Sequence, residues 1–442
     1  MKLMKKGGLN LMKKNNKKML LTFELGILVI MCILLFLSSC SKQPNPNSTS
    51  NNNPSTPINT PANTNTPTSS EFVGINKPAL VDGMKAIKWE TNDWVEVNSP
   101  DTDTSWYDYK KKPDAGSGEW ANAKTSDGSY WVWIPRFAYK ISDEKVEIIF
   151  LLNNTNKDEN SKEMPSDFVV HPAFTNKVSE GGWDSEISGF WVSQFEAAEV
   201  DNSLVFKLNA YSYHNITIGD AYAISKELPY DNSFPHLIKT SEWGAVAYLA
   251  VSPYGRDGVE VSANLTKATL SDGKTTAVTA GGNGVDGLAA TEQEALVKNA
   301  NQSTTGNVYG VYDMAGGLWE RVAAYINNGN DNLLLNGKAI MEDGDPNSSS
   351  KYKTVYAYNK ADDTNEANYN LNKAVKGDAM FETSSGIGKK SWFGDESSFM
   401  YGNAVFLHRG GTTINDPGVG IFTFSNTPGM AGNPLGFRCT IT

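Results

Sequence analysis

The sequence predicts an α+β fold in which antiparallel strands are combined with two helices and long loops. Strand-like runs of β-branched and aromatic residues occur at 130–137, 146–150 and 190–195. Helical periodicity occurs at about 219–228 and again from Thr240 onward. Four apolar residues of the second helix fall on one face: Trp243, Val246, Ala247 and Ala250. The composition is that of a globular protein, because 39% of the 442 residues are hydrophobic and 11% are aromatic.

Residues 1–39 are predicted to be a signal peptide rather than part of the fold. Seven lysines precede an apolar run at 25–37, which has thirteen residues. A membrane-spanning helix needs about 20. The run ends in Leu37-Ser-Ser-Cys40, which resembles the bacterial lipobox, where a peptidase cleaves before a cysteine that receives a diacylglycerol group. We therefore expect Cys40 to be lipidated and to begin the mature protein; the alternative is an uncleaved N-terminal anchor.

Residues 40–71 are predicted to form a disordered tether, because this stretch consists almost entirely of Asn, Pro, Ser and Thr. The whole chain carries a formal charge of −10, and residues 1–39 contribute +6, so the chain from Cys40 onward carries −16. Nucleic acids and anionic lipid headgroups require clustered cations. An acidic mature protein is therefore a poor candidate for binding nucleic acid.

A small β-rich module is predicted at 72–127, where aromatic residues are separated by Asp-Gly turn signals at 82 and 127. The main domain is predicted at 128–442. Within it, the polar stretch between the second helix and Asn307, and a second one at 327–386, are predicted to be surface excursions.

The cysteines predict no internal disulfide. Of the three, Cys32 lies in the signal peptide, Cys40 is the expected lipidation site and Cys439 is then alone. We expect Cys439 to be a small residue of the core.

Three glycine-containing blocks lie near the end of the chain, at 309–320, 409–411 and 436–439. They read Tyr-Gly-Val-Tyr-Asp-Met-Ala-Gly-Gly-Leu-Trp-Glu, Arg-Gly-Gly and Gly-Phe-Arg-Cys. Each combines glycines, which permit close backbone approach, with aromatic or charged residues. Each block therefore indicates a tight turn anchored in a core.

In this order, the blocks resemble those of the formylglycine-generating enzyme and sulfatase-modifying-factor family, a variant of the C-type lectin fold. The runs at 130–137, 189–196, 219–222 and 237–243 are also similar to strands and helix starts of that family. The resemblance covers about 128–442 and implies a C-type-lectin-like domain.

In that family, oxidation uses two cysteines after the Arg-Gly-Gly block, which bind copper. The corresponding residues here are Asn415 and Gly420, neither of which supplies a thiolate. We therefore expect no copper and no formylglycine-generating activity. The four histidines have no metal-ligand spacing, and no nucleophile elbow occurs. The alternative is an enzyme of this group with a non-standard active site formed by Glu196, Asp313 and Glu320.

The resemblance also implies a calcium site in the first block. The matching positions are Asp313, Gly316, Leu318 and Glu320. Carboxylate and carbonyl oxygens on a tight loop suit a hard cation. The block departs from the family pattern at Gly317 and Arg321, where Asn and Trp are usual. If Arg321 pairs with Glu320 or Asp313, the loop needs no ion.

The segment between Gly411 and Gly436 resembles the ending of variable proteins diversified by retroelements, in which outward residues form a ligand-binding patch. Alternation directs Phe422 and Phe424 toward the core and the intervening residues outward. The expected ligand-binding residues are Thr412, Thr413, Asn415, Asp416, Ile421, Thr423, Ser425 and Asn426. The alternative is a fixed surface strand with no special partner.

Several conspicuous residues near these blocks are expected to be structural. Arg409 and Arg438 are predicted to hold loops through buried hydrogen bonds. Trp319 is expected in the core, and His408 beside a strand.

Together, these features predict a lipoprotein held by Cys40 in the cell membrane of a Gram-positive-type bacterium. On the extracellular face it would display a non-catalytic C-type-lectin-like domain to a protein or glycan ligand.

Overall fold

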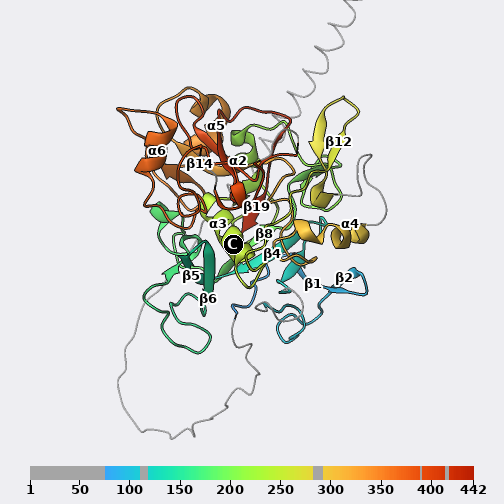
Figure 1. Ribbon diagram of the computed structural model, residues 1–442. Helices are drawn as coiled ribbons and strands as arrows, with labels where there is room; N and C mark the ends of the chain where they lie inside the picture. The colour runs from blue at the N-terminus through green and yellow to red at the C-terminus, as the bar shows by residue number, and fades with distance from the viewer. Residues whose placement is uncertain (1–74, 110–117, 282–291, 389–390, 414–417) are drawn as a thin grey trace, which may run out of the picture. The chain divides into compact units, whose positions relative to one another are not determined.

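The computed structural model describes residues 75–109, 118–281, 292–388, 391–413 and 418–442 (Figure 1). The predicted signal peptide, the tether with Cys40, and the patch residues Asn415 and Asp416 lie outside these ranges. The described chain is a mixed α+β structure with mostly antiparallel sheets, as predicted. Within it, no helix is both long and apolar enough to cross a bilayer.

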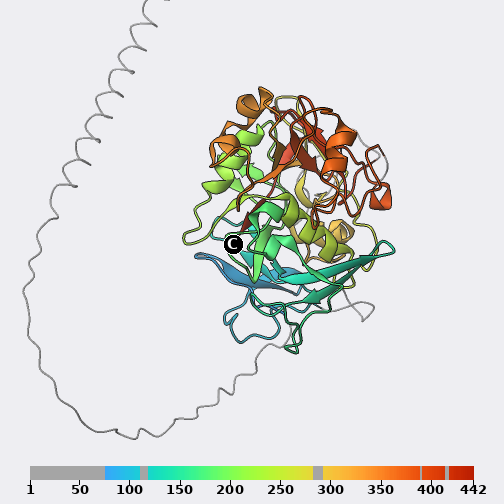
Figure 2. The same ribbon diagram turned by 90° about the vertical axis from the view of Figure 1, so that its left-hand side faces the viewer.

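The largest sheet is antiparallel and has seven strands in the order β11-β19-β8-β4-β3-β1-β2. Their bounds are β1 Lys85–Glu90, β2 Asp93–Glu96, β3 Asn122–Lys124, β4 Tyr130–Pro135, β8 Gly189–Ser193, β11 His236–Leu237 and β19 Cys439–Ile441. Figure 2 shows its blue and teal strands from a second direction.

The prediction of a separate module at 72–127 was wrong, because β1, β2 and β3 of this segment belong to the seven-stranded sheet. The described residues all fall in one compact unit. Trp106 and Trp120 are fully buried in the same core as Trp131 of β4. The tryptophans that suggested a self-contained module are instead the side chains that attach this segment to the rest.

The second sheet is built around β14 (Trp319–Ile326), and all eight residues of this strand are buried. Its strands are ordered β15-β14-β16-β17, with β18 also paired to β14. The bounds are β15 Thr354–Tyr356, β16 Phe406–Arg409, β17 Phe424–Thr427 and β18 Leu435–Phe437. Both β15 and β18 run parallel to β14. The pairing of Glu320 with Gly436 joins the first and last glycine blocks directly.

The remaining strands form small sheets. They are β5 Phe137–Ser142, β6 Lys145–Phe150 and β7 Val169–Val170 in one sheet, β9 Ala198–Val200 with β10 Ser203–Val205, and β12 Lys267–Thr269 with β13 Thr275–Ala277. Short 3-10 turns lie at η1 Pro172–Phe174, η2 Val178–Glu180, η3 Thr279–Gly281, η4 Ala300–Gln302 and η5 Trp392–Gly394.

Both predicted helices are present. Helix α2 (Ile218–Lys226) begins at Thr217, whose side chain accepts a hydrogen bond from the Asp220 N–H. Helix α3 (Thr240–Val251) begins as predicted, but every one of its residues is buried rather than one face alone. A Cβ at Gly244 would overlap the carbonyl of Gly377, so glycine lets another loop pack directly against α3.

The segments predicted as excursions contain further helices: α4 Glu292–Lys298, α5 Asn332–Glu342 and α6 Asn365–Leu371. Much of the second excursion is folded into the protein. Tyr369 of α6 and Met380 after it are fully buried in the main core.

Candidate functional site

The first glycine block forms a tight buried turn into β14. Asp313, Gly316 and Gly317 have φ values of 64°, 77° and 68°, in the left-handed region that favours glycine. A Cβ at Gly317 would overlap Glu196 Oε1, so the turn and that carboxylate require a glycine there. The Leu318 N–H then donates to Glu196 Oε1 at 2.7 Å.

Arg438, rather than Arg321, neutralises this turn. Its guanidinium forms a bidentate pair with Glu320, in which Nε lies 2.6 Å from Oε2, and both side chains are fully buried. It also donates to the Ser193 and Tyr312 carbonyls, at 3.1 and 2.9 Å. Pairing of Arg321 with Glu320 or Asp313 was therefore wrong. Neighbouring strand residues point to opposite faces, and Arg321 donates to the carbonyls of Ile216 and Met430 instead.

Asp313 is held by donors from two other segments. Its carboxylate accepts from the Asn264 side-chain amide at 2.9 Å and from the Ala280 N–H at 2.9 Å. Glu196 differs, because its Oε2 is buried and has no hydrogen-bond partner among the described residues. Of these three carboxyl groups, Glu320 is the one that pairs directly with Arg438.

Burial dominates the electrostatics of this cluster. It raises the pKa of Asp313 to about 6 and that of Glu320 to about 7, while the Arg438 charge opposes both rises. Burial, reinforced by the Glu320 and Asp313 charges, raises the pKa of Glu196 well above its usual range. The geometry pairs Arg438 with Glu320 rather than with Glu196.

These contacts do not fit the calcium site that the sequence suggested at Asp313, Gly316, Leu318 and Glu320. Both Glu320 oxygens face Arg438, and the Asp313 oxygens already accept N–H donors. Among the described residues, no group of three or more His, Cys, Asp or Glu side chains is arranged to hold a metal. The turn is closed by protein donors, with Arg438 in the role considered for Arg321.

The expected ligand patch is largely covered. Thr412, Thr413, Ile421 and Thr423 are buried, so their predicted outward orientation was wrong. Phe422 and Phe424 are both fully buried, the position expected for them. Only the half-buried Ser425 and Asn426 reach the surface among the described members of the patch.

The long chain before β16 pairs with the edge of β17. The Ser398 N–H donates to Phe424 O at 2.9 Å, and Asn426 donates to Phe399 O at 2.7 Å. Asp395 accepts from the Phe422 N–H at 2.8 Å, and its carboxylate occupies the space of a Cβ at Gly420. Alternation along one strand cannot reveal which other segments bury its side chains.

The residues that were expected to be structural make buried hydrogen bonds or ring contacts, or lie in the core. Arg409 donates to the carbonyls of Thr423, Asp378 and Ala379 at 2.8–3.0 Å. His408 stacks on Trp319 with ring centroids 4.0 Å apart, and burial lowers the pKa of this imidazole to about 3. Burial also raises the pKa of the Cys439 thiol to about 12, which suits a core cysteine.

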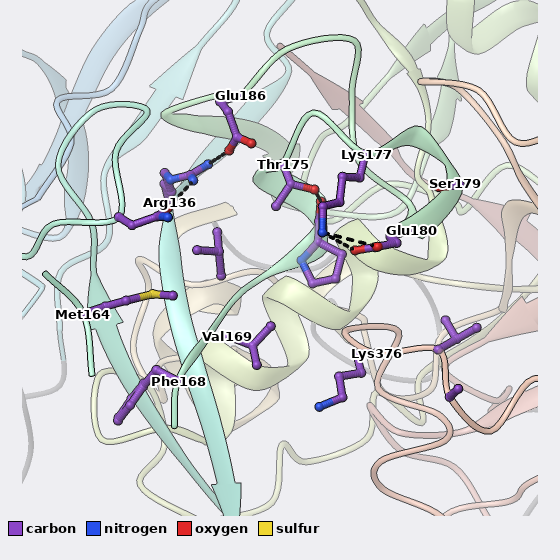
Figure 3. A pocket seen from close by; sticks show the side chains of 15 residues that line it. Arg136, Met164, Phe168, Val169, Thr175, Lys177, Ser179, Glu180, Glu186 and Lys376 are labelled. Atoms are coloured by element: carbon purple, nitrogen blue, oxygen red, sulfur yellow. Dashed lines mark hydrogen bonds and ion pairs between the residues drawn. The ribbon is translucent and has the colours of Figure 1, made fainter. Parts of the chain in front are cut away.

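The sequence did not predict one pocket of the described structure, which we call the Arg136 pocket. It has a volume of about 590 Å³ and lies between the end of β4, the β7 region, η2 and the loop after α6 (Figure 3). Met164, Phe168 and Val169 form an apolar side, and Lys376 lies on the opposite side (Figure 3). Its size is within the range of ligand sites.

Two of the three cations that line the Arg136 pocket form ion pairs within the described structure, and the third does not. Arg136 is 1% exposed, pairs with Glu186 at 2.6 Å and donates to Phe174 O at 2.7 Å, so it acts as a fixed wall (Figure 3). Lys177 pairs with Glu180 at 3.4 Å. Lys376 is exposed, and it forms no ion pair with the residues that the structure describes.

The one sequence signal for this pocket was Arg136 itself, a charge placed directly after the apolar β4 run. The other lining residues come from segments far apart in the sequence. The sequence matches no protein-family model, and no curated protein is detectably similar to it.

Proposed function

We propose that this protein is a bacterial surface lipoprotein, anchored through Cys40, whose C-type-lectin-like domain binds a protein or glycan ligand without catalysing a reaction. The Arg136 pocket is the observation that carries this proposal. It combines an open apolar side with Lys376, a cation that has no acidic partner among the described residues. Such a combination recognises an apolar side chain next to an acidic group. These features favour a protein ligand at this pocket.

The buried turn supports a scaffolding role. Glu320 and Arg438 are fully buried and satisfy one another, and Asp313 is satisfied by backbone and amide donors. Such groups hold a fold together without contacting a substrate. Gly420, at a position where the formylglycine-generating enzymes have a copper-binding cysteine, has no thiol. The Asp395 carboxylate occupies the space that a side chain at Gly420 would need.

Binding is tested with the full-length protein, immobilised by its N-terminal lipid and screened against protein and glycan arrays. Phe168→Ala and Lys376→Glu should each reduce binding of a protein hit at least about tenfold, as expected for residues at the centre of an interface. Leu335→Ala is the matched control, because Leu335 is 76% exposed on α5 and does not line the pocket. Binding that survives both pocket variants would contradict the proposal.

Anchoring has its own test. Cys40→Ala should abolish incorporation of labelled fatty acid and release the protein from the membrane fraction. Retention in the membrane without label would favour the uncleaved N-terminal anchor.

An enzyme with a non-standard site is the second candidate. The observation in its favour is the cluster of Glu196, Asp313 and Glu320, since carboxyl groups with raised pKa values are common at catalytic sites. Oxygen consumption with a thiol-containing peptide is the discriminating assay. Consumption that is lost in Glu196→Gln would establish this candidate.

A further inference from the structure

A second pocket, which we call the Trp94 pocket, lies at the edge of the large sheet. It has a volume of about 390 Å³. Its walls come from β1, β2, the β3–β4 turn and α4, so it is distinct from the Arg136 pocket. Six of its lining residues carry the argument: Lys85, Asp93, Trp94, Ser126, Tyr130 and Gln293.

The sheet places aromatic rings on one face at this edge. Trp94 of β2 lies directly opposite Trp89 of β1, and their rings meet edge to face with centroids 5.3 Å apart. Trp94 also contacts Tyr309 at 5.6 Å and Tyr130 at 6.4 Å. Trp94 is only half-buried, so this aromatic cluster is not closed over as a core would be.

Polar side chains surround the aromatic floor. Gln293 of α4 donates to Asp93 Oδ1 at 2.8 Å, which joins the helix to the β1–β2 turn. Lys85 pairs with Glu96 at 2.8 Å, and Lys124 donates to the Tyr130 hydroxyl at 3.0 Å. The Trp94 Nε1–H has no hydrogen-bond partner among the described residues.

The charges of this lining cancel. It contains two lysines and two carboxylates, together with hydroxyl and amide groups. A pyranose ring presents an apolar face of C–H bonds that packs on an aromatic ring, and hydroxyls at its rim that pair with amides and carboxylates. A cavity with a balanced charge suits a sugar without an acidic group.

We propose that the Trp94 pocket binds a neutral sugar unit of a glycan, stacked on Trp94 and hydrogen-bonded through Asp93 and Gln293. This site lies outside the Arg136 pocket and outside the segment that follows the Arg-Gly-Gly block. The protein therefore carries a sugar site in addition to the proposed site for a protein ligand.

The test uses the full-length protein in a polyoxyethylene detergent, since sugar-based detergents would compete. The probes are immobilised neutral oligosaccharides of glucose, galactose, mannose and N-acetylglucosamine, with sialylated oligosaccharides as the acidic arm. Wild type should bind at least one neutral probe in preference to the acidic arm. Trp94→Ala should weaken that binding at least about tenfold, while Trp94→Phe retains most of it.

A second variant guards against misfolding of Trp94→Ala. Ser126→Gln enlarges an exposed side chain at the pocket wall without removing any core contact, and should also weaken the binding. Unchanged sugar binding in both variants, a preference for the acidic arm, or no binding of any neutral probe would overturn the sugar site. The Phe168→Ala variant distinguishes the two proposals, because it should lose the protein ligand and keep the sugar.

Discussion

Replacing Arg438 by Met tests whether the buried pair with Glu320 holds the C-terminal segment to β14. The substitution keeps an unbranched apolar side chain, although a shorter one, and removes the charge and the donors to the Ser193 and Tyr312 carbonyls. Breaking a fully buried pair by removing one partner costs about 3–5 kcal/mol. We expect a loss of that size in the free energy of unfolding.

The corresponding change in melting temperature follows from the size of the folded unit. Unfolding entropy is about 2.1 cal/mol/K per residue, so a unit of roughly 370 residues has about 0.8 kcal/mol/K. The expected decrease is therefore about 4–6 °C at pH 7, measured by circular dichroism. It should be smaller at pH 5, because Glu320 without its partner takes up a proton more readily there.

The matched control is Lys338→Met, which removes an exposed pair with Glu342 at 3.8 Å. An exposed pair of this kind contributes at most about 0.5 kcal/mol, or less than about 1 °C here. If Arg438→Met lowers the melting temperature no more than Lys338→Met does, the structural role of the buried pair is refuted. In a double-mutant cycle, adding Glu320→Leu should recover part of the loss.

Three further outcomes follow from the same contacts. Excess EDTA should leave the melting temperature unchanged, because Asp313 and Glu320 already face protein donors; a decrease that calcium reverses would restore the ion site. Gly317→Ala should cost about 1–3 kcal/mol more than Gly273→Ala, since both glycines have positive φ but only Gly317 faces a neighbouring oxygen. The pKa of His408 is lowered to about 3, so its contribution to stability is present above about pH 6.5 and is lost as pH falls toward 3. His408→Phe should therefore reduce the pH dependence of unfolding in that range by about 1 kcal/mol per pH unit, measured by urea titration; equal slopes would contradict the burial of a neutral imidazole.

The sequence predicted local elements well where one segment carries its own signal. The start of α3 at Thr240 follows from its periodicity, and the buried arginines follow from charges between glycine and aromatic residues. The burial of Phe422 was also predicted, although its neighbours Ile421 and Thr423 are buried as well.

Features that depend on a distant segment could not be read from the pattern. Ile421 and Thr423 are buried although alternation directs them outward, because alternation along one strand says nothing about the other segments that pack around it. The predicted domain boundary at 127 was wrong for a similar reason. A sequence rich in turns and aromatic residues looks the same whether its strands pair among themselves or extend a larger sheet. The choice of Arg438 over Arg321 required knowing that β18, which directly precedes Arg438, pairs with β14, and that Glu320 rather than Arg321 points toward Arg438.

Binding at the Arg136 pocket is the central claim, and site-directed photocrosslinking on the cell surface tests it most directly. A photoreactive phenylalanine analogue would replace Val169, which is 39% exposed in the pocket, and in a second variant Leu335, which is 76% exposed outside it. The account predicts that Val169 yields one defined covalent adduct with a ligand from the array screen and that Leu335 does not. Equal labelling from both positions, or none from Val169 while the ligand remains bound, would contradict it.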